Sequence, residues 1–398
     1  MLNFYSGISK AVNTAKATRE CLEAALGDNA ADANLVILSS TLGHKFEQML
    51  STAREICPKA EIVGCTGSGV IGTGWVSEAM RAMAAMVIVG DDLTVASRSG
   101  VTTETSEDVA LQCAKELKEK NANINMILVM GPGLNVNGEG IIKGIESHFG
   151  PDVPLLGALG GFGGTTPRTP VFHTEEIHDD GLVLVGFSDP SLALAQKAHH
   201  GCLAQENYRF TITKSDGVRV DELDGKPAWP TFISSLGMPP ETSPMDIILL
   251  LGIGIDLPED DANDYDNKQI LRAPLMLSDD GQSMFFQTVV PEGTELVSCQ
   301  RNEDYLFSGS DHLADRISDE IGKSTPVAVF QADCMARGRL GHDVVDKTEI
   351  IDKLQGSFPN ASELPWLGVY GFAEFCTLNG KNQFHNYTTS LSVILRSS

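Results

Sequence analysis

The sequence predicts an α/β protein with mixed β-sheets and flanking helices, built from duplicated subdomains. Three observations predict it. An apolar strand, a polar or glycine-containing stretch, a helical pattern, a glycine-rich turn and a second apolar strand recur three times along the chain. The opening strands are short and continuously apolar, as expected for strands that are covered on both faces. Of the 398 residues, 42% are hydrophobic but only 6% are aromatic, which indicates a core of aliphatic side chains.

The first copy of this pattern extends from residue 34 to residue 90. Its opening strand covers 34–40 (NLVILSS), and an amphipathic helical stretch follows over 44–56. The glycine-rich segment 61–72 (EIVGCTGSGVIG) then leads to an apolar strand at 84–90. Glycine in such a turn allows positive φ and the close approach of a neighbouring backbone or a ligand.

The second and third copies repeat these elements in the same order. In the second copy the four elements cover 125–130, 140–149, 153–164 and 181–187. In the third copy they cover 326–330, 345–354, 364–374 and 389–395. Repeats of roughly 90–100 residues indicate duplicated subdomains, because the units of a solenoid are only about 20–50 residues long.

The middle of the chain has a different pattern. An alternating strand at 208–213 precedes a turn and the start of a helix at 221–228, and 247–255 is interpreted as a buried strand. Short antiparallel strands are expected further on, at 272–277, 284–289 and 294–298. We expect a boundary between residues 195 and 210, which divides the chain into 1–200 and 201–398.

Charge and cysteine usage exclude several classes of function. The chain has 29 Lys+Arg and 53 Asp+Glu, a formal net charge of -24, and no long basic run, so a nucleic-acid partner is not expected. No apolar run reaches the ~18–20 residues of a membrane span, and the first ten residues do not resemble a signal peptide. The eight cysteines form no CxxC pair and no zinc spacing. We therefore expect reduced thiols, no bound metal and a cytoplasmic location.

A set of short motifs, taken in order, resembles the FIST family. The N-terminal half contributes a Gly-Cys-Thr-Gly loop and two later segments, and the C-terminal half contributes turns and a closing strand. These motifs lie at 63–72, 154–158, 171–173, 180–181, 223–228, 271–274, 290–293, 334–338, 368–374 and 384–388. The resemblance implies a FIST N region at 1–200 and a FIST C region at 201–398, which together cover nearly the whole chain.

The resemblance implies a sensory module that binds a small ligand, with amino acids proposed as ligands. Some bacterial members are linked to haem and nitric oxide sensing, and some eukaryotic members are F-box receptors. This chain departs from the pattern at Ala373, where the family usually has Gly before the Glu of the C-terminal turn. It also has no room for an F-box, kinase or chemoreceptor module, so a partner protein is expected to carry the output.

Cys334 and Arg337 are the first candidate site residues. They follow the predicted strand 326–330, and ligands in open α/β sheets bind at the carboxyl ends of strands. Arg337 offers a forked donor to a carboxylate and lowers the pKa of a nearby thiol. Three interpretations remain open: contact with a ligand, catalysis by Cys334 with a base such as His342 or His385, and a buried structural thiol beside a surface Arg.

A second candidate is the loop Cys65, Thr66, Gly67 and Ser68. Backbone N–H groups and hydroxyls between glycines are suited to hold an anionic group. The glycine spacing also resembles a dinucleotide fingerprint, but no clear helix or acidic partner follows it. A tight turn that packs two subdomains together would also account for this loop.

The last candidates lie in the C-terminal turn and before the final strand. Glu374 stands between two phenylalanines, and a buried carboxylate must find a donor or shift its pKa. It is a candidate partner for Arg337 or for the ammonium group of a ligand, or else a solvated strand-end residue. Tyr370, His385 and Asn386 join the candidates through the same motifs, although Asn386 also suits a role in satisfying backbone groups.

The function predicted from these residues is an intracellular sensory protein that binds a small polar ligand and acts through a partner. We expect binding without catalysis, and no cofactor. Haem is a weaker candidate ligand, because no histidine is an obvious axial ligand, and His199 and His200 are interpreted as a solvated pair. Two different functions also fit the sequence: an enzyme that depends on Cys334, and a scaffold whose acidic surface binds a basic partner.

Overall fold

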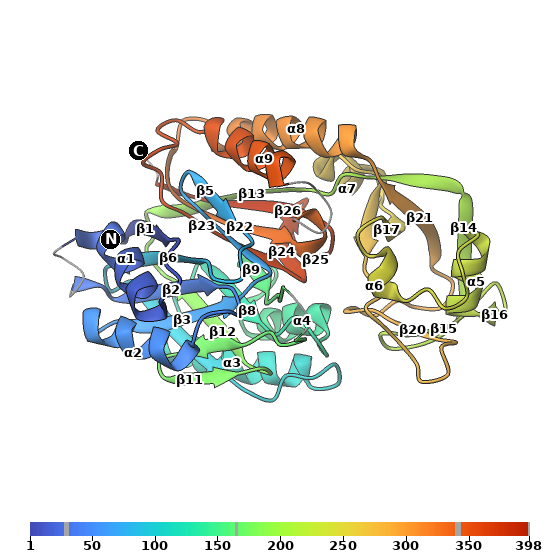
Figure 1. The fold of residues 1–398 in the computed structure, drawn as a ribbon, viewed down its shortest axis with the longest axis horizontal. Coiled ribbons are helices and arrows are strands. Elements are labelled where there is room, and N and C mark those ends of the chain that lie inside the picture. Colours follow the sequence, from blue (N-terminus) through green and yellow to red (C-terminus); the bar gives the residue numbers. More distant parts are fainter. Residues whose placement is uncertain (28–31, 164–165, 339–343, 397–398) are drawn as a thin grey trace.

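The computed structural model describes residues 1–27, 32–163, 166–338 and 344–396. Its α/β architecture consists of three similar repeats and one inserted segment (Figure 1). This confirms the predicted fold class of mixed β-sheets with flanking helices.

The first repeat alternates strands and helices and contains one hairpin. Its elements are β1 (Asn3–Ser9), α1 (Thr14–Leu26), β2 (Leu35–Ser40), α2 (Phe46–Ile56), β3 (Glu61–Thr66), the hairpin β4 (Gly69–Gly72) and β5 (Trp75–Ser77), and β6 (Met83–Val89). The second repeat has the same order: β7 (Leu93–Arg98), α3 (Ser106–Lys120), β8 (Met126–Gly131), α4 (Gly138–Phe149), β9 (Leu155–Leu159), the hairpin β10 (Val171–His173) and β11 (Glu176–His178), and β12 (Leu182–Phe187).

The third repeat is interrupted after its first strand. It begins with β13 (Leu192–His199) and resumes with α8 (Glu303–Ile321), β22 (Thr325–Cys334), the short 3₁₀ helix η2 (Met335–Arg337), α9 (Val344–Gly356), β23 (Trp366–Gly371), the hairpin β24 (Ala373–Leu378) and β25 (Lys381–His385), and β26 (Thr389–Arg396). The prediction missed the first strand and first helix of every repeat. In the third repeat, 202–301 separate that strand from its helix.

The inserted segment forms its own antiparallel sheet with short helices beside it. Its elements are β14 (Cys202–Asp216), β15 (Arg219–Leu223), β16 (Lys226–Pro227), α5 (Ala228–Ser235), α6 (Pro244–Ile247), β17 (Leu251–Asp256), α7 (Glu259–Tyr265), β18 (Gln269–Arg272), β19 (Met276–Leu277), β20 (Met284–Phe285) and β21 (Glu295–Arg301). Three expected strands differ from the prediction. The run 272–277 is divided between the end of β18 and the short strand β19. The run 247–255 contains the end of α6 before β17 begins, and 284–289 keeps only β20 as strand.

The three repeats exchange their hairpins in a cycle. Each repeat supplies four strands to its own sheet, and the next position in that sheet is taken by a hairpin from another repeat. The sheets have the orders β1-β6-β2-β3-β10-β11, β7-β12-β8-β9-β24-β25 and β13-β26-β22-β23-β4-β5. The hairpin of repeat 1 therefore lies on the sheet of repeat 3, that of repeat 2 on the sheet of repeat 1, and that of repeat 3 on the sheet of repeat 2.

The parallel strand pairs β2–β3, β8–β9 and β22–β23 lie at the centre of the molecule. β2, β8 and β23 are buried at every position, which explains their continuously apolar sequences. One core cluster takes side chains from all three sheets, including Ile37, Leu128 and Phe330. A central cavity of about 30 Å³ is lined by residues of all three pairs. This is room for about one or two water molecules, not for a larger ligand.

Candidate functional site

The three glycine-rich turns meet at the carboxyl ends of the parallel strands. Their backbones form a closed ring of hydrogen bonds: Ser68 N to Tyr370 O at 2.9 Å, Phe372 N to Leu159 O at 3.1 Å, and Gly161 N to Thr66 O at 2.8 Å. Each bond joins one repeat to another. A Cβ on Gly161 would lie 2.5 Å from the carbonyl oxygen of Tyr370, so only glycine allows this approach.

The loop Cys65–Ser68 is part of this junction. Cys65 and Thr66 are buried, and burial raises the pKa of the Cys65 thiol to about 12. The N–H groups of Gly67 and Ser68 donate to Ser40 O and Tyr370 O, so they are not available to hold an anion. The geometry of these two amides supports the interpretation as a turn that packs subdomains together. Ser68 also lines a surface pocket, described below.

Arg337 forms a buried ion pair with Asp333. Its Nε lies 3.1 Å from Asp333 Oδ1, and the two side chains are 5% and 2% exposed. Asp333 Oδ2 accepts a hydrogen bond from Gln331, whose oxygen accepts one from the indole N–H of Trp366. Burial raises the pKa of Asp333 to about 6, although Arg337 opposes the shift. Within the described residues Arg337 Nη1 is buried and has no hydrogen-bond partner.

Cys334 follows Asp333 on β22, so the two side chains point to opposite faces of the sheet. It packs in an apolar cluster with Cys202, Val297 and Tyr387. Burial raises its thiol pKa well above the ordinary value, and the nearby Glu374 adds to this shift. Because a nucleophilic cysteine needs a lowered pKa, this environment works against catalysis by Cys334.

Glu374 is fully buried in β24 and has no cation beside it within the described residues. Its Oε2 accepts hydrogen bonds from the N–H and the hydroxyl of Thr388 at 3.2 and 2.7 Å. Its Oε1 has no partner there, and burial raises its pKa well above the ordinary range. Burial therefore favours the neutral form of Glu374, and the expected pairing with Arg337 is replaced by the pair Asp333–Arg337.

His385 and Asn386 are held by internal contacts. The ring of His385 lies 3.3 Å from the Tyr265 hydroxyl and 3.2 Å from the carbonyl of Cys376, and burial lowers its pKa to about 3. The amide of Asn386 binds Ala273 N, Gln287 Oε1 and Phe372 O. Asn386 therefore joins the inserted segment to the junction.

A surface pocket of about 130 Å³ opens beside the junction and contains one acidic residue, Glu78. It is lined by Thr41, Leu42, Gly43, Ser68, Glu78, Ala79, Met80 and Gly163. Glu78 lies against the backbone of Gly338, next to Arg337. Charges of Asp333, Glu78 and Arg337 all act on the hydroxyl of Tyr370, whose pKa burial raises well above the ordinary value. These residues therefore form one polar cluster at the carboxyl end of β22.

The structure brings Cys65–Ser68, Tyr370 and Arg337 to this end of the sheets, but it places Cys334, Glu374, His385 and Asn386 in packed surroundings. Sequence reasoning missed Glu78 and Asp333. For Asp333, the sequence contained one signal, its spacing of four residues from Arg337, which suits an ion pair. Glu78 gave none, because it reaches the third repeat only through the exchanged hairpin β4–β5. His342 lies outside the described residues.

The described residues contain no group of three side chains suited to hold a metal ion. The interpretation of His199 and His200 as a solvated pair is wrong, because both are 1% exposed. His199 packs against Gly309 of α8, where a Cβ would lie 1.9 Å from its ring, and its ring contacts Tyr305. His199 is therefore held by packing inside the third repeat. Over the described range, no helix is long and apolar enough to cross a membrane.

Comparisons with known proteins identify two family models. A model described as the FIST N domain matches residues 34–226, and one described as the FIST C domain matches residues 236–377. No curated protein sequence matches the chain. Among solved structures, a cyanuric acid hydrolase from A. caulinodans is 7% identical with a TM-score of 0.39, and the alignment covers 100% of both chains. PurL of T. maritima complexed with AMPPCP is 9% identical with a TM-score of 0.22, over 99% of this chain and 72% of that one. Similarity at this level carries no argument about function.

Proposed function

Because the chain belongs to the FIST family, whose domains are recognised as sensory domains that bind small ligands, we propose that it senses a small polar ligand such as an amino acid. The ligand binds in the pocket beside Glu78 and Ser68, at the carboxyl ends of β2 and β3. A partner protein then recognises the ligand-bound form. The proposal places the protein in the cytoplasm, where its eight buried free thiols stay reduced.

The observation that carries this proposal is an acidic side chain, Glu78, in the wall of a small pocket, with a buried base, Arg337, one residue before the Gly338 that Glu78 contacts. An amino acid has an ammonium and a carboxylate, so its binding site needs groups of both signs. Glu78 lines the pocket and suits the ammonium, while Arg337, whose Nη1 is unpartnered within the described residues, suits the carboxylate. Gly338 joins the two, because its backbone lies against the carboxylate of Glu78.

The size of the pocket supports a small ligand. Its volume of about 130 Å³ corresponds to about four water molecules at ~30 Å³ each. Ser68 and Thr41 also line the pocket, although the Thr41 hydroxyl is held by Met80 O and Ala82 N and the Ser68 hydroxyl donates to Tyr370 O. A nucleotide or a haem group is far larger than this space.

Thermal unfolding with a panel of amino acids, nucleotides, small organic acids and haemin tests the proposal. A ligand at 100 times its dissociation constant adds about 2.7 kcal/mol to the free energy of unfolding and raises the midpoint. We expect an amino acid to give this shift in the wild type and to lose it in Glu78→Gln. The matched control is Glu119→Gln, an exposed glutamate on α3 outside the pocket. No shift with any amino acid would count against the proposal.

A further inference from the structure

The first strand of each repeat, β1, β7 or β13, forms one edge of its sheet, and an exchanged hairpin forms the other. Such an edge presents unpaired backbone N–H and C=O groups that bind other chains unless they are covered. In the second repeat, Nζ of Lys120 at the end of α3 donates to Val95 O of β7 at 2.9 Å. In the third repeat, Oε1 of Glu320 near the end of α8 accepts from Gln196 N of β13 at 3.2 Å. A charged side chain from the last helical turn therefore covers each of these two edges.

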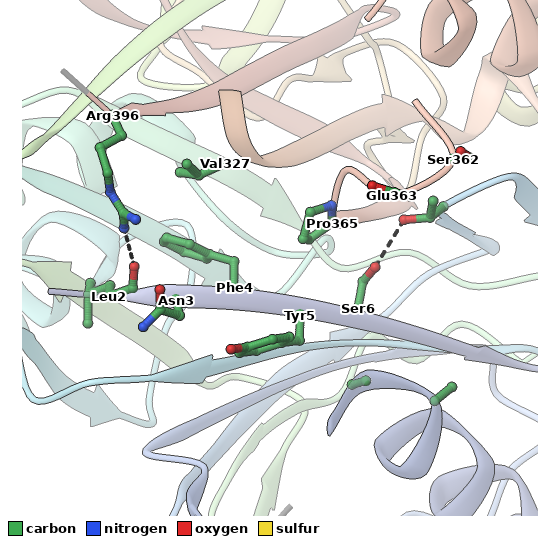
Figure 2. Close-up of a pocket in the computed structure, with 13 residues that line it drawn as sticks. Leu2, Asn3, Phe4, Tyr5, Ser6, Val327, Ser362, Glu363, Pro365 and Arg396 are labelled. Atoms are coloured by element: carbon green, nitrogen blue, oxygen red, sulfur yellow. Dashed lines mark hydrogen bonds between the residues drawn. The ribbon is translucent and has the colours of Figure 1, made fainter. Parts of the chain in front are cut away.

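In the first repeat no side chain of α1 makes such a bond within the described residues, and the charged side chains on this edge, Asp189 and Arg396, bond to Leu2 at its beginning. The last turn of α1 presents Ala24 and Ala25 where the other repeats have Lys120 and Glu320. A groove of about 600 Å³ runs along β1 at this place, between these alanines and a wall that includes Val327 and Pro365 (Figure 2). The corresponding groove along β7, which contains Lys120, measures about 350 Å³.

Backbone groups of β1 face this groove. Leu2 N donates to Asp189 Oδ2 at 2.7 Å, and Leu2 O accepts from Arg396, so both groups of Leu2 point away from β6. Along an edge strand, the backbone groups of successive residues point alternately toward and away from the neighbouring strand. Phe4 and Ser6 therefore also direct their N–H and C=O groups away from β6. The five residues from Leu2 to Ser6 all line the groove, which spans about 14 Å of strand.

The two ends of the groove carry opposite charges. Arg396 lies beside Leu2, and its side chain is partly exposed and donates to Leu2 O. Glu363 lies at the other end, near Ser6 (Figure 2). An extended peptide that runs antiparallel to β1 would place its C-terminal carboxylate at Arg396 and its N-terminal or basic end at Glu363.

We propose that the edge of β1 binds an extended peptide segment of a partner protein, about five residues long, as an added antiparallel strand. Main-chain hydrogen bonds to Phe4 and Ser6 supply affinity, and a carboxylate at Arg396 supplies orientation. A second copy of this chain is a poorer occupant. The wall formed by Val327 and Pro365 makes the edge a recess that admits one strand, and two copies with a net charge of -24 repel each other. This binding does not depend on the ligand pocket at Glu78.

Selection from a phage-displayed library of random heptapeptides tests the proposal, followed by fluorescence anisotropy with the selected peptide. Ala25→Lys introduces the kind of cover that Lys120 gives β7, at a partly exposed helix position, and a thermal unfolding curve checks that the variant is folded. We expect it to weaken binding at least tenfold, and Arg396→Gln to weaken a free-acid peptide more than its C-terminal amide. The matched control is Ser51→Lys, which adds the same charge at an exposed position of α2 and should leave the affinity unchanged.

Two further readouts make the result decisive. N-methylation of the peptide amide opposite Phe4 should abolish binding, and the Phe4 amide should gain protection from hydrogen exchange when the peptide is bound. Failure to select any peptide, or equal affinity of Ala25→Lys and wild type, would overturn the proposal. Self-association of the wild type that Ala25→Lys abolishes would also overturn it, because the edge would then serve a second copy. Glu78→Gln should bind the peptide normally, which separates this test from that of the ligand pocket.

Discussion

Nε of Arg337 donates to Oδ1 of Asp333 over 3.1 Å, and both side chains are buried. This pair distinguishes the third repeat from the other two, as a comparison of equivalent strand positions shows. Asp333 pairs with Tyr370 across the parallel strands, as Ser40 pairs with Thr66 in the first repeat and Gly131 with Leu159 in the second. Of these three equivalent positions, only the third carries a charge. Asp333 and Glu78 therefore place charged side chains at the carboxyl end of β22, whereas the equivalent ends of β2 and β8 carry none.

Asp333→Asn should change how stability depends on pH. The folded-state pKa of about 6 lies above the ordinary value of 3.8, so the cost of burying the charge is absent below about pH 4 and complete above about pH 6. The wild type should lose about 3 kcal/mol of unfolding free energy across this window through Asp333. In Asp333→Asn the unfolding free energy should no longer fall between about pH 4 and pH 6 through this residue, although Arg337 is left unpaired at every pH. Urea unfolding at several pH values measures it, with exposed Asp152→Asn as control. Equal slopes in wild type and Asp333→Asn would contradict the assignment.

Gly161→Ala should strongly destabilise the protein. Its Cβ would lie 2.5 Å from Tyr370 O and 3.2 Å from Ser68 N, inside the ring that joins the three repeats. Overpacking of this kind costs about 1–3 kcal/mol or more. Gly163→Ala is the matched control in the same loop, because its Cβ would meet nothing closer than 3.4 Å. Chemical denaturation compares them, and equal stability of the two variants would show that the ring does not hold the repeats together.

All eight cysteines should react slowly with iodoacetamide in the native protein. Each is buried, and desolvation raises the pKa of Cys65, Cys113 and Cys299 to about 12 and that of Cys334 well above its ordinary range. We expect labelling at least about tenfold slower than in urea. Peptide mass mapping after short exposure follows each site separately. Selective fast labelling of Cys334 would instead favour an enzyme that uses this thiol.

The buried histidines should make the protein sensitive to acid. Burial lowers the pKa of His199 to about 2, of His385 to about 3 and of His200 to about 4. Their neutral forms are favoured in the fold, so the stability present above about pH 6.5 is lost as the pH falls. His199→Asn should reduce this loss by up to about 1.4 kcal/mol per pH unit between about pH 6 and pH 4. Unfolding curves measure it against exposed His312→Asn, and an unchanged slope would show that folding does not lower the pKa of His199.

The sequence predicts the repeated core well, because strands such as β2 and β8 are buried on both faces and are therefore continuously apolar. It does not predict β1, whose sequence NFYSGIS mixes exposed and buried positions at a sheet edge. The exchange of hairpins is also invisible in one sequence, since no local pattern says which sheet a hairpin joins.

The same limits apply to the site. The glycine-rich turns and Arg337 are visible as motifs, and the structure brings them to one end of the sheets. The role of Glu374 depends on burial, which the sequence does not give: two flanking phenylalanines suit both a solvated and a buried carboxylate. Glu78 enters the site from a different repeat, so only the tertiary structure connects it with Arg337.

Calorimetric titration of the protein with the amino acid that gives the largest thermal shift tests the central claim most directly. The account predicts one binding site per chain, affinity at least tenfold lower in Glu78→Gln, and unchanged affinity in Glu119→Gln. Absence of binding heat for every amino acid in the panel, or equal affinity in wild type and Glu78→Gln, would contradict it.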